Sequence, residues 1–315
     1  MTAALFTSIA SAQDAAASYP NKTVRIVVGY QAGGPTDMTA RLIASKLQAS
    51  LGQAFIVDNK PGASSNRASE IVATSPPDGY TLLVAASQII SSSVLFKDVK
   101  FNVEKSFVPI TEIMTSPAVL VVGPSMQVKS IAELTALAKK NPDKYSFAST
   151  GSASVPHVSA EMFQQGAQIK LLHVPYKGAG LALNDLMGGQ VDVFFMTALS
   201  AIPHIQSGKV RPLAVTSMQR LPQLPDVPTM DESGIKNVEL ASWNGLMAPA
   251  GTPKPIVDKL YAEVAKILND PEVRKTFNDQ AAMVVGSSPA EFAERIRKEV
   301  QRVTELSKTM KIELD

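Results

Sequence analysis

The sequence has no cysteine, only three histidines and few aromatic residues, and each scarcity removes a kind of chemistry. Without cysteine there is no disulfide, thiolate–metal site or Fe–S cluster. The histidines His157, His173 and His204 lie 16 and 31 residues apart, which matches no metal-binding pair. Aromatic residues are 6% of the chain and offer little for stacking single-stranded nucleic acid. We therefore expect no metal, no cofactor and no thiol catalysis.

Charge and length narrow the class of protein further. The formal net charge is +2, from 30 Lys and Arg against 28 Asp and Glu, so no basic field favours a nucleic acid. The apolar runs at 26–28 and 118–122 are far shorter than the ~20 residues of a membrane span. A chain of 315 residues is long for one core, because domains typically have roughly 100–200 residues. These features predict a globular protein of two domains without a nucleic-acid partner.

Residues 1–13 have the composition of a signal-peptide end. They are small and apolar, and Ala10-Ser11-Ala12 has the small-x-small pattern that signal peptidase cleaves. The basic segment that normally begins such a peptide is missing. We interpret 1–13 as a signal-peptide remnant whose start lies upstream, with a mature chain from about Gln13 or Asp14; a frayed N-terminus is the alternative.

From Thr23 the sequence alternates between short β-rich runs and amphipathic helical stretches, which predicts βαβ units and an α/β fold with mainly parallel sheets. Expected strands are 24–28, 54–57, 81–86, 119–122, 145–148, 170–174, 191–195, 210–215 and 243–248. Expected helices include 36–51, 65–74, 155–165, 178–187 and 199–207. Ser130 and Glu133 form a capping box before another helix, and two apolar stripes after residue 255 predict a helical end.

No flexible linker separates the two α/β halves, so we expect the chain to cross between domains through ordered segments near 117–122 and 240–246. The predicted first lobe is 14–118 plus 244–315, and the second lobe is 119–243. Two crossings form a hinge, which makes a cleft between the lobes the default ligand site.

Two glycine- and serine-rich turns, each before a helix, are the main candidate binding features. The first is 29–37, where adjacent glycines permit positive φ and Thr36 is placed to cap the helix, with Asp37 and Arg41 one turn apart. The second is 149–157, where hydroxyls and amides precede a helix with Pro156 in its first turn. Helix N-termini attract anions, so the turns predict a carboxylate site. An ordinary βα turn and an ordinary serine cap are the alternatives.

A serine hydrolase using Ser152 and His157 is a rival interpretation. The sequence lacks GxSxG, and no acid is placed to orient the imidazole, so we expect no catalytic residues.

Several segments together resemble the periplasmic substrate-binding receptors of tripartite tricarboxylate transporters, the Bug-type receptors. They cover nearly everything after residue 19 and include Ala32-Gly33-Gly34-Pro35-Thr36-Asp37, Asn59-Lys60-Pro61-Gly62-Ala63, Pro77-Asp78-Gly79-Tyr80, Ser149-Thr150-Gly151 with Pro156-His157, Val174-Pro175-Tyr176-Lys177-Gly178, Gly189-Gln190-Val191-Asp192, Pro225-Asp226-Val227-Pro228-Thr229 and Trp243-Asn244-Gly245. Ser64-Ser65-Asn66-Arg67 stands where the family usually has Gly-Gly-Asn, and Gln31 where it often has a smaller residue. These departures concern the distal part of the pocket.

The resemblance implies a two-lobed periplasmic-binding-protein fold of type II, with two crossover strands and a central ligand cleft. Residues implied to contact the ligand are Tyr30, Gly33, Gly34, Thr36, Asp37, Ser87, Ser149, Thr150, Gly151, Ser154, His157 and Thr197.

The implied function is that of an exported, monomeric periplasmic receptor that is not an enzyme. It would bind a di- or tricarboxylate, an acidic amino acid or an aromatic carboxylate such as terephthalate, and deliver it to integral-membrane permease subunits. A ligand-presenting sensor subunit for a membrane histidine kinase is the alternative with the same pocket. The effector domain of a DNA-bound regulator would need a helix-turn-helix module, and none precedes Thr23.

Overall fold

The computed structural model describes residues 18–62, 65–151, 154–176, 178–236, 238, 241–279 and 281–308. The predicted leader at 1–13 and Ser152 lie outside these residues. The chain divides into two compact units, each of which contains its own set of paired strands. The first unit contains the chain up to Met114 together with Trp243–Phe277 and Val284–Val303, and the second contains Thr115–Ser242, Asn278–Met283 and the chain from Thr304.

The first unit has a mixed sheet in the order β2-β1-β3-β9. Strands β1, β2 and β3 are parallel, and β9 runs antiparallel to β3. The strands are β1 (Val24–Val28), β2 (Phe55–Asn59), β3 (Thr81–Ala86) and β9 (Ala241–Pro249). The helices are α2 (Pro35–Leu51), α3 (Asn66–Ala73), α4 (Gln88–Leu95), α9 (Lys254–Asn269), α10 (Pro271–Asp279) and α11 (Pro289–Ser307).

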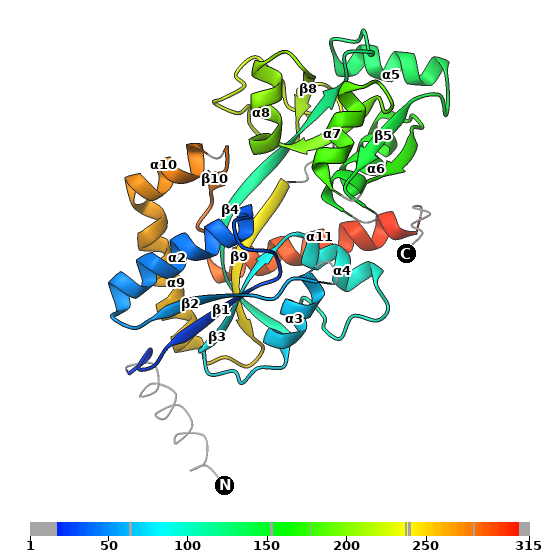
Figure 1. Ribbon diagram of the computed structural model, residues 1–315. Helices are drawn as coiled ribbons and strands as arrows, with labels where there is room; N and C mark the ends of the chain where they lie inside the picture. Colours follow the sequence, from blue (N-terminus) through cyan, green and yellow to red (C-terminus); the bar gives the residue numbers. More distant parts are fainter. Residues whose placement is uncertain are drawn as a thin grey trace. The chain divides into compact units, whose positions relative to one another are not determined.

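Alternation along the strands gives this sheet two buried faces. Val27, Leu83 and Met247 belong to one cluster with apolar residues of α3, α4 and α11, whereas the intervening Ile26 and Leu82 point to the opposite face. Helices α2 and α9 contact each other and cover that opposite face (Figure 1). Helix α2 follows β1, and α3 follows β2 on the opposite face, so the connections from β1 and β2 diverge and loops gather at the carboxyl ends of the strands.

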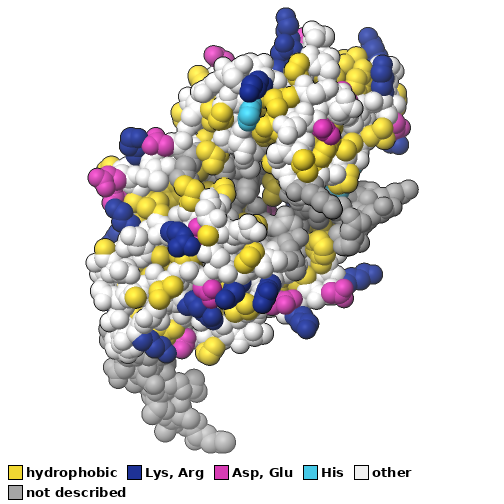
Figure 2. All heavy atoms as spheres, in the orientation of Figure 1, with side chains coloured by type: hydrophobic (Ala, Val, Ile, Leu, Met, Phe, Trp, Pro, Cys, Tyr) yellow, Lys and Arg dark blue, Asp and Glu magenta, His cyan; other side chains and the backbone are white. Residues whose placement is uncertain are grey.

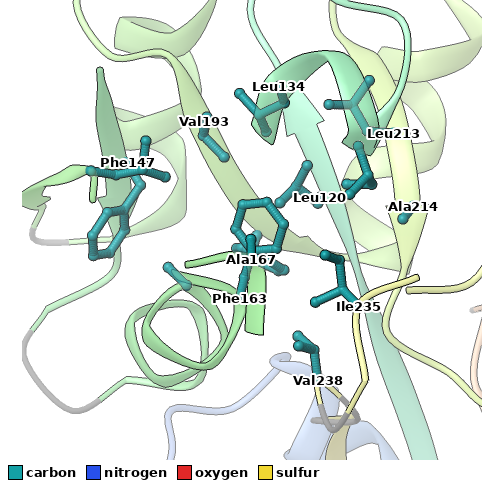
Figure 3. Packing of buried hydrophobic residues seen from close by; sticks show 14 of the residues in the cluster. Leu120, Leu134, Phe147, Phe163, Ala167, Val193, Leu213, Ala214, Ile235 and Val238 are labelled. Carbon is teal, nitrogen blue, oxygen red and sulfur yellow. The ribbon is translucent and has the colours of Figure 1, made fainter. Parts of the chain in front are cut away.

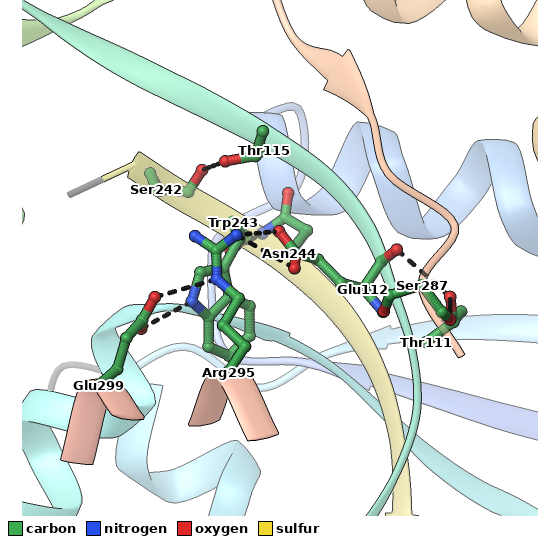
Figure 4. Close-up of polar contacts among 9 residues, drawn as sticks. All are labelled: Thr111, Glu112, Thr115, Ser242, Trp243, Asn244, Ser287, Arg295 and Glu299. Atoms are coloured by element: carbon green, nitrogen blue, oxygen red, sulfur yellow. Dashed lines mark hydrogen bonds and ion pairs between the residues drawn. The ribbon is translucent and has the colours of Figure 1, made fainter. Parts of the chain in front are cut away.

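A buried ion-pair network attaches α11 to two strands (Figure 4). Arg295 Nε lies 3.0 Å from Glu299 Oε1, and Arg295 Nη1 lies 2.9 Å from Glu112 Oε1 on β4 (Phe107–Val122). Trp243 Nε1 on β9 donates to Glu299 Oε2 at 2.9 Å. Burial raises the pKa of Glu299, although the neighbouring Arg295 and the Trp243 hydrogen bond oppose that rise. The network holds the indole of Trp243 in the core, edge-on to Phe292.

The second unit has strands in the order β4-β7-β5-β6, with β8 also paired to β4. Strands β5, β6 and β7 are parallel, and β4 is antiparallel to β7 and β8. The remaining strands are β5 (Ser146–Ser149), β6 (Leu172–Pro175), β7 (Val193–Thr197) and β8 (Arg211–Val215), and a short β10 (Met283–Val284) pairs with β4. The helices are α5 (Ile131–Lys140), α6 (Val155–Ala167), α7 (Ala179–Met187) and α8 (Ala198–Gln206).

The two faces of the second sheet carry different helices. Leu120, Phe147 and Val193 pack with α5 and α6 in the cluster drawn in Figure 3. The alternate residues Val121 and Phe194 pack with α7 and α8. The connection from β5 through α6 and the connection from β6 through α7 therefore lie on opposite faces, as those from β1 and β2 do in the first unit.

The structure confirms the α/β class and most predicted elements, and it changes several details. β4 begins at Phe107, well before the predicted 119, and α4 was not predicted. Gly34, and not Thr36, is the N-cap of α2. Ser130 caps α5 as predicted, but Glu133 Oε2 accepts from the N–H of Lys129 and not from that of Ser130.

The C-terminal segment also differs from the predicted lobe assignment, which gave all of 244–315 to the first lobe. Residues 278–283 and those from Thr304 belong to the second unit. Ala281 joins the cluster beside α7 and α8, and Leu306 joins the cluster beside α5 and α6. The clusters in which these side chains are buried show which unit each short segment belongs to, and secondary-structure patterns in the sequence do not contain that information.

Gly245 offers a test of the packing between β9 and α11. A Cβ atom at this position would lie 2.2 Å from Cζ of the buried Phe292, so Gly245→Ala should lower the free energy of unfolding by about 1–3 kcal/mol. Trp243 is the only tryptophan and lies in this core, so its fluorescence during urea unfolding reports the effect.

Gly180→Ala is the matched control for Gly245→Ala. Gly180 lies in helix α7, and a Cβ there meets nothing within 4 Å, so this change should stabilise by about 0.4–1 kcal/mol, measured by circular dichroism. Equal unfolding midpoints for Gly245→Ala and the wild type would contradict the packing argument.

Candidate functional site

The carboxyl ends of β1, β2 and β3, with the starts of α2, α3 and α4, form what we call the first half-site. Ligands of open α/β sheets bind outside the carboxyl ends of strands where connections diverge, and this edge of the first sheet has that topology. Each of the three helices begins with N–H groups that no carbonyl of the same helix accepts. These N–H groups give the half-site a positive potential without a cationic side chain.

The turn between β1 and α2 depends on glycine. Gly33 has φ +85°, and Gly34 is the extended N-cap residue before Pro35. The N–H of Gly33 donates to Asp37 Oδ2 at 2.8 Å, and the N–H of Met38 donates to the Gly34 carbonyl at 2.9 Å. The turn therefore has a fixed conformation in which Gly33 is exposed.

Asp37 lies inside this turn with a side chain only 1% exposed. Arg41 Nε donates to its Oδ2 at 2.8 Å, and Asn59 Nδ2 donates to its Oδ1 at 2.8 Å. Burial alone would raise the pKa of Asp37, but the hydrogen bonds from Arg41, Gly33 and Asn59 outweigh it and hold the pKa below its ordinary value. Both carboxylate oxygens are engaged, so the geometry assigns Asp37 to holding the turn. Direct contact between Asp37 and a ligand stays a prediction.

Thr36 and Tyr30 flank the same turn. Thr36 Oγ1 accepts from Asn244 Nδ2 at 3.1 Å, and Asn244 Oδ1 accepts from Thr39 at 3.2 Å, so β9 is bound to the first turn of α2. The Tyr30 carbonyl accepts from Asn59 Nδ2 at 3.0 Å. Burial raises the pKa of the Tyr30 phenol, and a hydrogen bond with Ser65 partly opposes this.

The start of α3 packs closely against the end of β1. Ser65 has φ +71°, and a Cβ on Gly29 would lie 2.4 Å from Ser65 Cβ, so the glycine permits this approach. Asn66 is buried, and its Oδ1 has no hydrogen-bond partner among the described residues. Asn59, Asn66 and Asn244 were not predicted as site residues, although Asn59 and Asn244 lie in segments that carry the family resemblance.

Ser87 is the predicted site residue at the start of α4. Its N–H donates to the Trp243 carbonyl at 3.0 Å. Its Oγ is buried, makes no capping hydrogen bond, and has no partner in the described part of the chain. A buried hydroxyl without a partner costs about 1–3 kcal/mol, so a polar group brought to this position would be stabilised.

The second half-site is formed by the carboxyl ends of β5, β6 and β7 and the starts of α6, α7 and α8. Ser149 is fully buried at the end of β5. Its Oγ accepts from the N–H of Gly151 at 3.2 Å, donates to the Gly151 carbonyl at 3.1 Å, and lies 2.6 Å from His173 Nε2. Gly151 has φ +120°, and the half-buried Thr150 lies at the bend. The geometry therefore assigns the Ser149 hydroxyl to the interior of the turn.

Ser154 and His157 lie at the start of α6. Ser154 is the N-cap residue with extended backbone, but its Oγ makes no capping bond and, within the described residues, has no partner. His157 is 4% exposed and stacks on His173 with ring centroids 3.9 Å apart. Burial, followed by the proximity of His173, lowers the pKa of His157 to about 4. His157 is therefore a neutral, packed imidazole at neutral pH.

Thr197 and Tyr176 complete this edge. Thr197 is exposed at the end of β7, with Oγ1 2.8 Å from Ser200 Oγ. Tyr176 donates to Asp185 Oδ2 at 2.9 Å, and burial with this bond raises the pKa of Tyr176 to about 12. Thr197 is placed where a ligand could reach it, whereas the Tyr176 hydroxyl is bound to α7.

Two cationic side chains near the first half-site, Arg41 and Lys60, are paired with carboxylates. Arg41 pairs with Asp37, and Lys60 Nζ lies 3.0 Å from Asp58 Oδ1. Across the face shown in Figure 2, Lys and Arg side chains are interspersed with Asp and Glu. Over the described ranges there is no cluster of three or more His, Asp and Glu side chains that could hold a metal ion, and no helix with the length and apolarity to cross a membrane.

A surface hollow of about 530 Å³ lies elsewhere on the second unit, lined by residues such as Lys129, Pro212 and Glu232. Pro212 pairs with Val121, near the end of β4 where β7 begins, whereas Thr197 pairs with Ala118 at the other end. The hollow is therefore at the opposite edge of the sheet from the second half-site.

Comparison with known proteins shows similarity across both units. The family described as "Tripartite tricarboxylate transporter family receptor" matches residues 39–312. Protein BugT of Bordetella pertussis is 33% identical over 287 residues, which cover 90% of this chain and 88% of BugT. The structure of R. palustris Rpa4515 with adipate has a TM-score of 0.79 and 34% identity, covering 92% of this chain and 98% of that one. MatC from Rhodopseudomonas palustris with bound malate has a TM-score of 0.76 and 32% identity, and the match covers 91% of this chain and 99% of MatC.

Asp37→Asn tests the role of the carboxylate in the first turn. At pH 7 we expect the free energy of unfolding to fall by about 1–3 kcal/mol, since Gly33 and Arg41 lose a charged acceptor. The folded-state pKa of Asp37 is lowered, so the wild-type carboxylate stabilises fully above its unfolded-state pKa and loses this effect as the pH falls through the folded-state pKa. Urea unfolding should therefore show a large difference at pH 7 and a smaller one at pH ~3.

Asp258→Asn is the matched control for Asp37→Asn. Asp258 forms an i,i+4 pair with Lys254 at 2.7 Å on an exposed face of α9, so its loss should cost less than about 1 kcal/mol. An effect of Asp37→Asn no larger than that of this control would contradict the assignment of Asp37 to the turn.

Proposed function

The chain belongs to the tripartite tricarboxylate transporter receptor family, and on that premise we propose that it is a periplasmic solute-binding receptor for a small organic carboxylate. Each unit would contribute one carboxylate-binding turn, 29–37 in the first unit and 149–157 in the second. The receptor performs no chemistry on the ligand.

The observation that carries the proposal is a pair of buried serine hydroxyls at helix starts. Ser87 Oγ and Ser154 Oγ belong to different half-sites, both precede a helix, and neither bonds to any described residue. A carboxylate accepts hydrogen bonds from hydroxyls, and bonds to a charged acceptor are stronger than neutral ones. Both hydroxyls therefore suit an anionic ligand.

Helix N-termini and the relatives' ligands support the same ligand class. Six helices begin at the two half-sites, and each start carries roughly half a positive charge. Arg41 and Lys60 are already paired with Asp37 and Asp58, so backbone dipoles supply much of the attraction at the first half-site. Rpa4515 with adipate and MatC with malate both hold carboxylates.

Family membership supports the finer parts of the proposal. The ligand is a di- or tricarboxylate or an aromatic carboxylate such as terephthalate. The protein is exported after removal of a leader, acts as a monomer, and delivers its ligand to the integral-membrane permease subunits of a tripartite tricarboxylate-type transporter.

A thermal-shift screen against organic acids tests the ligand class. A carboxylate at 100 times its Kd should stabilise the fold by about 2.7 kcal/mol, which raises the melting temperature measurably. Adipate, malate, citrate and terephthalate form the first panel, and the amide of each acid is the neutral control. Stabilisation by none of a broad set of carboxylates, or equal stabilisation by acid and amide, would overturn the proposal.

Ser154→Ala tests the observation that carries the proposal. The hydroxyl has no bond to lose in the free protein, so the melting temperature without ligand should not fall. Affinity for the carboxylate should fall roughly tenfold or more, because a hydrogen bond to a charged group is removed.

Ser125→Ala is the matched control for Ser154→Ala. Ser125 is exposed in the loop after β4, at the opposite edge of the same sheet. Loss of its hydroxyl should change neither the melting temperature without ligand nor the affinity for the carboxylate. If calorimetric titration shows unchanged affinity in Ser154→Ala, the hydroxyl has no part in binding.

A further inference from the structure

Three aromatic rings contact one another beside the turn of the second half-site, with His173 stacked on each of the other two. Phe147 on β5 and His173 on β6 are register partners, and their rings stack with centroids 4.9 Å apart, the spacing of adjacent strands. His157 on α6 also stacks on His173, at 3.9 Å and with the rings 15° from parallel, and lies 6.0 Å from Phe147. The His173 ring therefore contacts one ring from β5 and one from α6, and both contacts restrict its rotation.

All hydrogen-bonding positions of the Ser149 hydroxyl are used in this arrangement. A hydroxyl has one donor and two acceptor positions. When the hydroxyl donates to the Gly151 carbonyl and accepts from the Gly151 N–H, one acceptor position is left for His173 Nε2, 2.6 Å away. That bond needs the His173 tautomer with hydrogen on Nε2. The imidazole thereby sets the direction of the hydroxyl that closes the turn around Gly151.

From this geometry we infer that His173 is a positioning residue for ligand recognition: it orients the Ser149 hydroxyl and so fixes the turn that receives the carboxylate, without touching the ligand itself. The inference rests on the proposed function, because it assigns a role within the same binding site. His157 contributes by stacking, which holds the His173 ring at the correct angle.

Both rings are neutral under physiological conditions. Burial lowers the pKa of His173, and burial with the adjacent His173 lowers that of His157 to about 4. Glu161 lies beside the pair: its Oε1 is 3.8 Å from His157 Nε2, and burial raises its own pKa. Because both pKa values lie below the ordinary value, neither imidazole should change charge between pH 7.2 and 8, so carboxylate affinity should be constant over that range.

A double-mutant cycle separates positioning from simple packing. His173→Phe keeps a ring in the stack but removes the hydrogen bond, and should weaken binding of an adipate, malate or terephthalate probe by about three- to tenfold. Ser149→Ala should have a similar effect. The double variant should lose no more than the larger single effect, because both changes break the same contact.

Two further variants serve as controls for the cycle. His173→Gln restores an N–H donor and should recover most of the affinity. His204→Phe changes the histidine outside the stack, on α8, and should leave affinity unchanged. Calorimetric titration of each full-length variant at pH 6.5, 7.2 and 8 gives the affinities, and melting temperatures without ligand give the structural cost.

Several results would overturn the inference. Additive losses in the double variant, or a lowered melting temperature with unchanged affinity in His173→Phe, would show that the ring is packing only. A change of wild-type affinity between pH 7.2 and 8 that disappears in His173→Gln would show that the imidazole titrates at the site. If no carboxylate binds the wild-type chain, the proposed function itself is wrong. If a carboxylate binds and its affinity does not change in the Ser149 and His173 variants, only the inference about His173 is wrong.

Discussion

A glycine N–H bound by a buried side-chain oxygen is the interaction on which each half-site depends. In the first unit the N–H of Gly33 donates to Asp37, and in the second the N–H of Gly151 donates to Ser149. Both glycines have positive φ, a conformation that other residues adopt only with strain. The two turns differ in sequence, but the same contact fixes both between a parallel strand and a helix N-terminus.

Side chains on neighbouring strands form hydrogen bonds with these buried oxygens. The conformation of each turn therefore also depends on the sheet beside it. Asp37 is bound by Arg41 on its own helix and by Asn59 at the end of β2. Ser149 is bound by His173 on β6. In each unit, therefore, the strand beside the turn-bearing strand supplies the side chain that completes the turn. The parallel pairing of the strands places these side chains beside the turn.

Strand β9 couples the core of the first unit to its half-site. Trp243 enters the core and donates to Glu299 on α11, whereas the next residue, Asn244, bonds Thr36 and Thr39 on α2. Successive residues of a strand point to opposite faces, so one dipeptide connects the two helical layers. The ion pairs of Arg295 with Glu299 and Glu112 keep this strand and β4 attached to the same helix.

Local sequence patterns were sufficient for the class of fold and for the two candidate turns. Apolar runs separated by amphipathic helices identify the βαβ units, and glycine-rich or serine-rich turns before helices are visible without any tertiary contact. The Asp37–Arg41 pair was also predictable, because residues four apart in a helix are neighbours. The serine cap of α5 is of the same local kind.

Roles that depend on long-range contacts were decided only by the tertiary structure. Thr36 is not a cap because Gly34 takes that position, and its hydroxyl accepts from Asn244, 208 residues away along the chain. Ser149 and His157 look like ligand contacts in sequence, yet Ser149 is buried against His173, and His157 stacks on the same ring. The sequence by itself determined which elements form and which turns precede helices, since these follow from neighbouring residues. Which polar groups fix the turns and which are left without a partner depends on atoms brought together by the sheets, and only the fold supplies those.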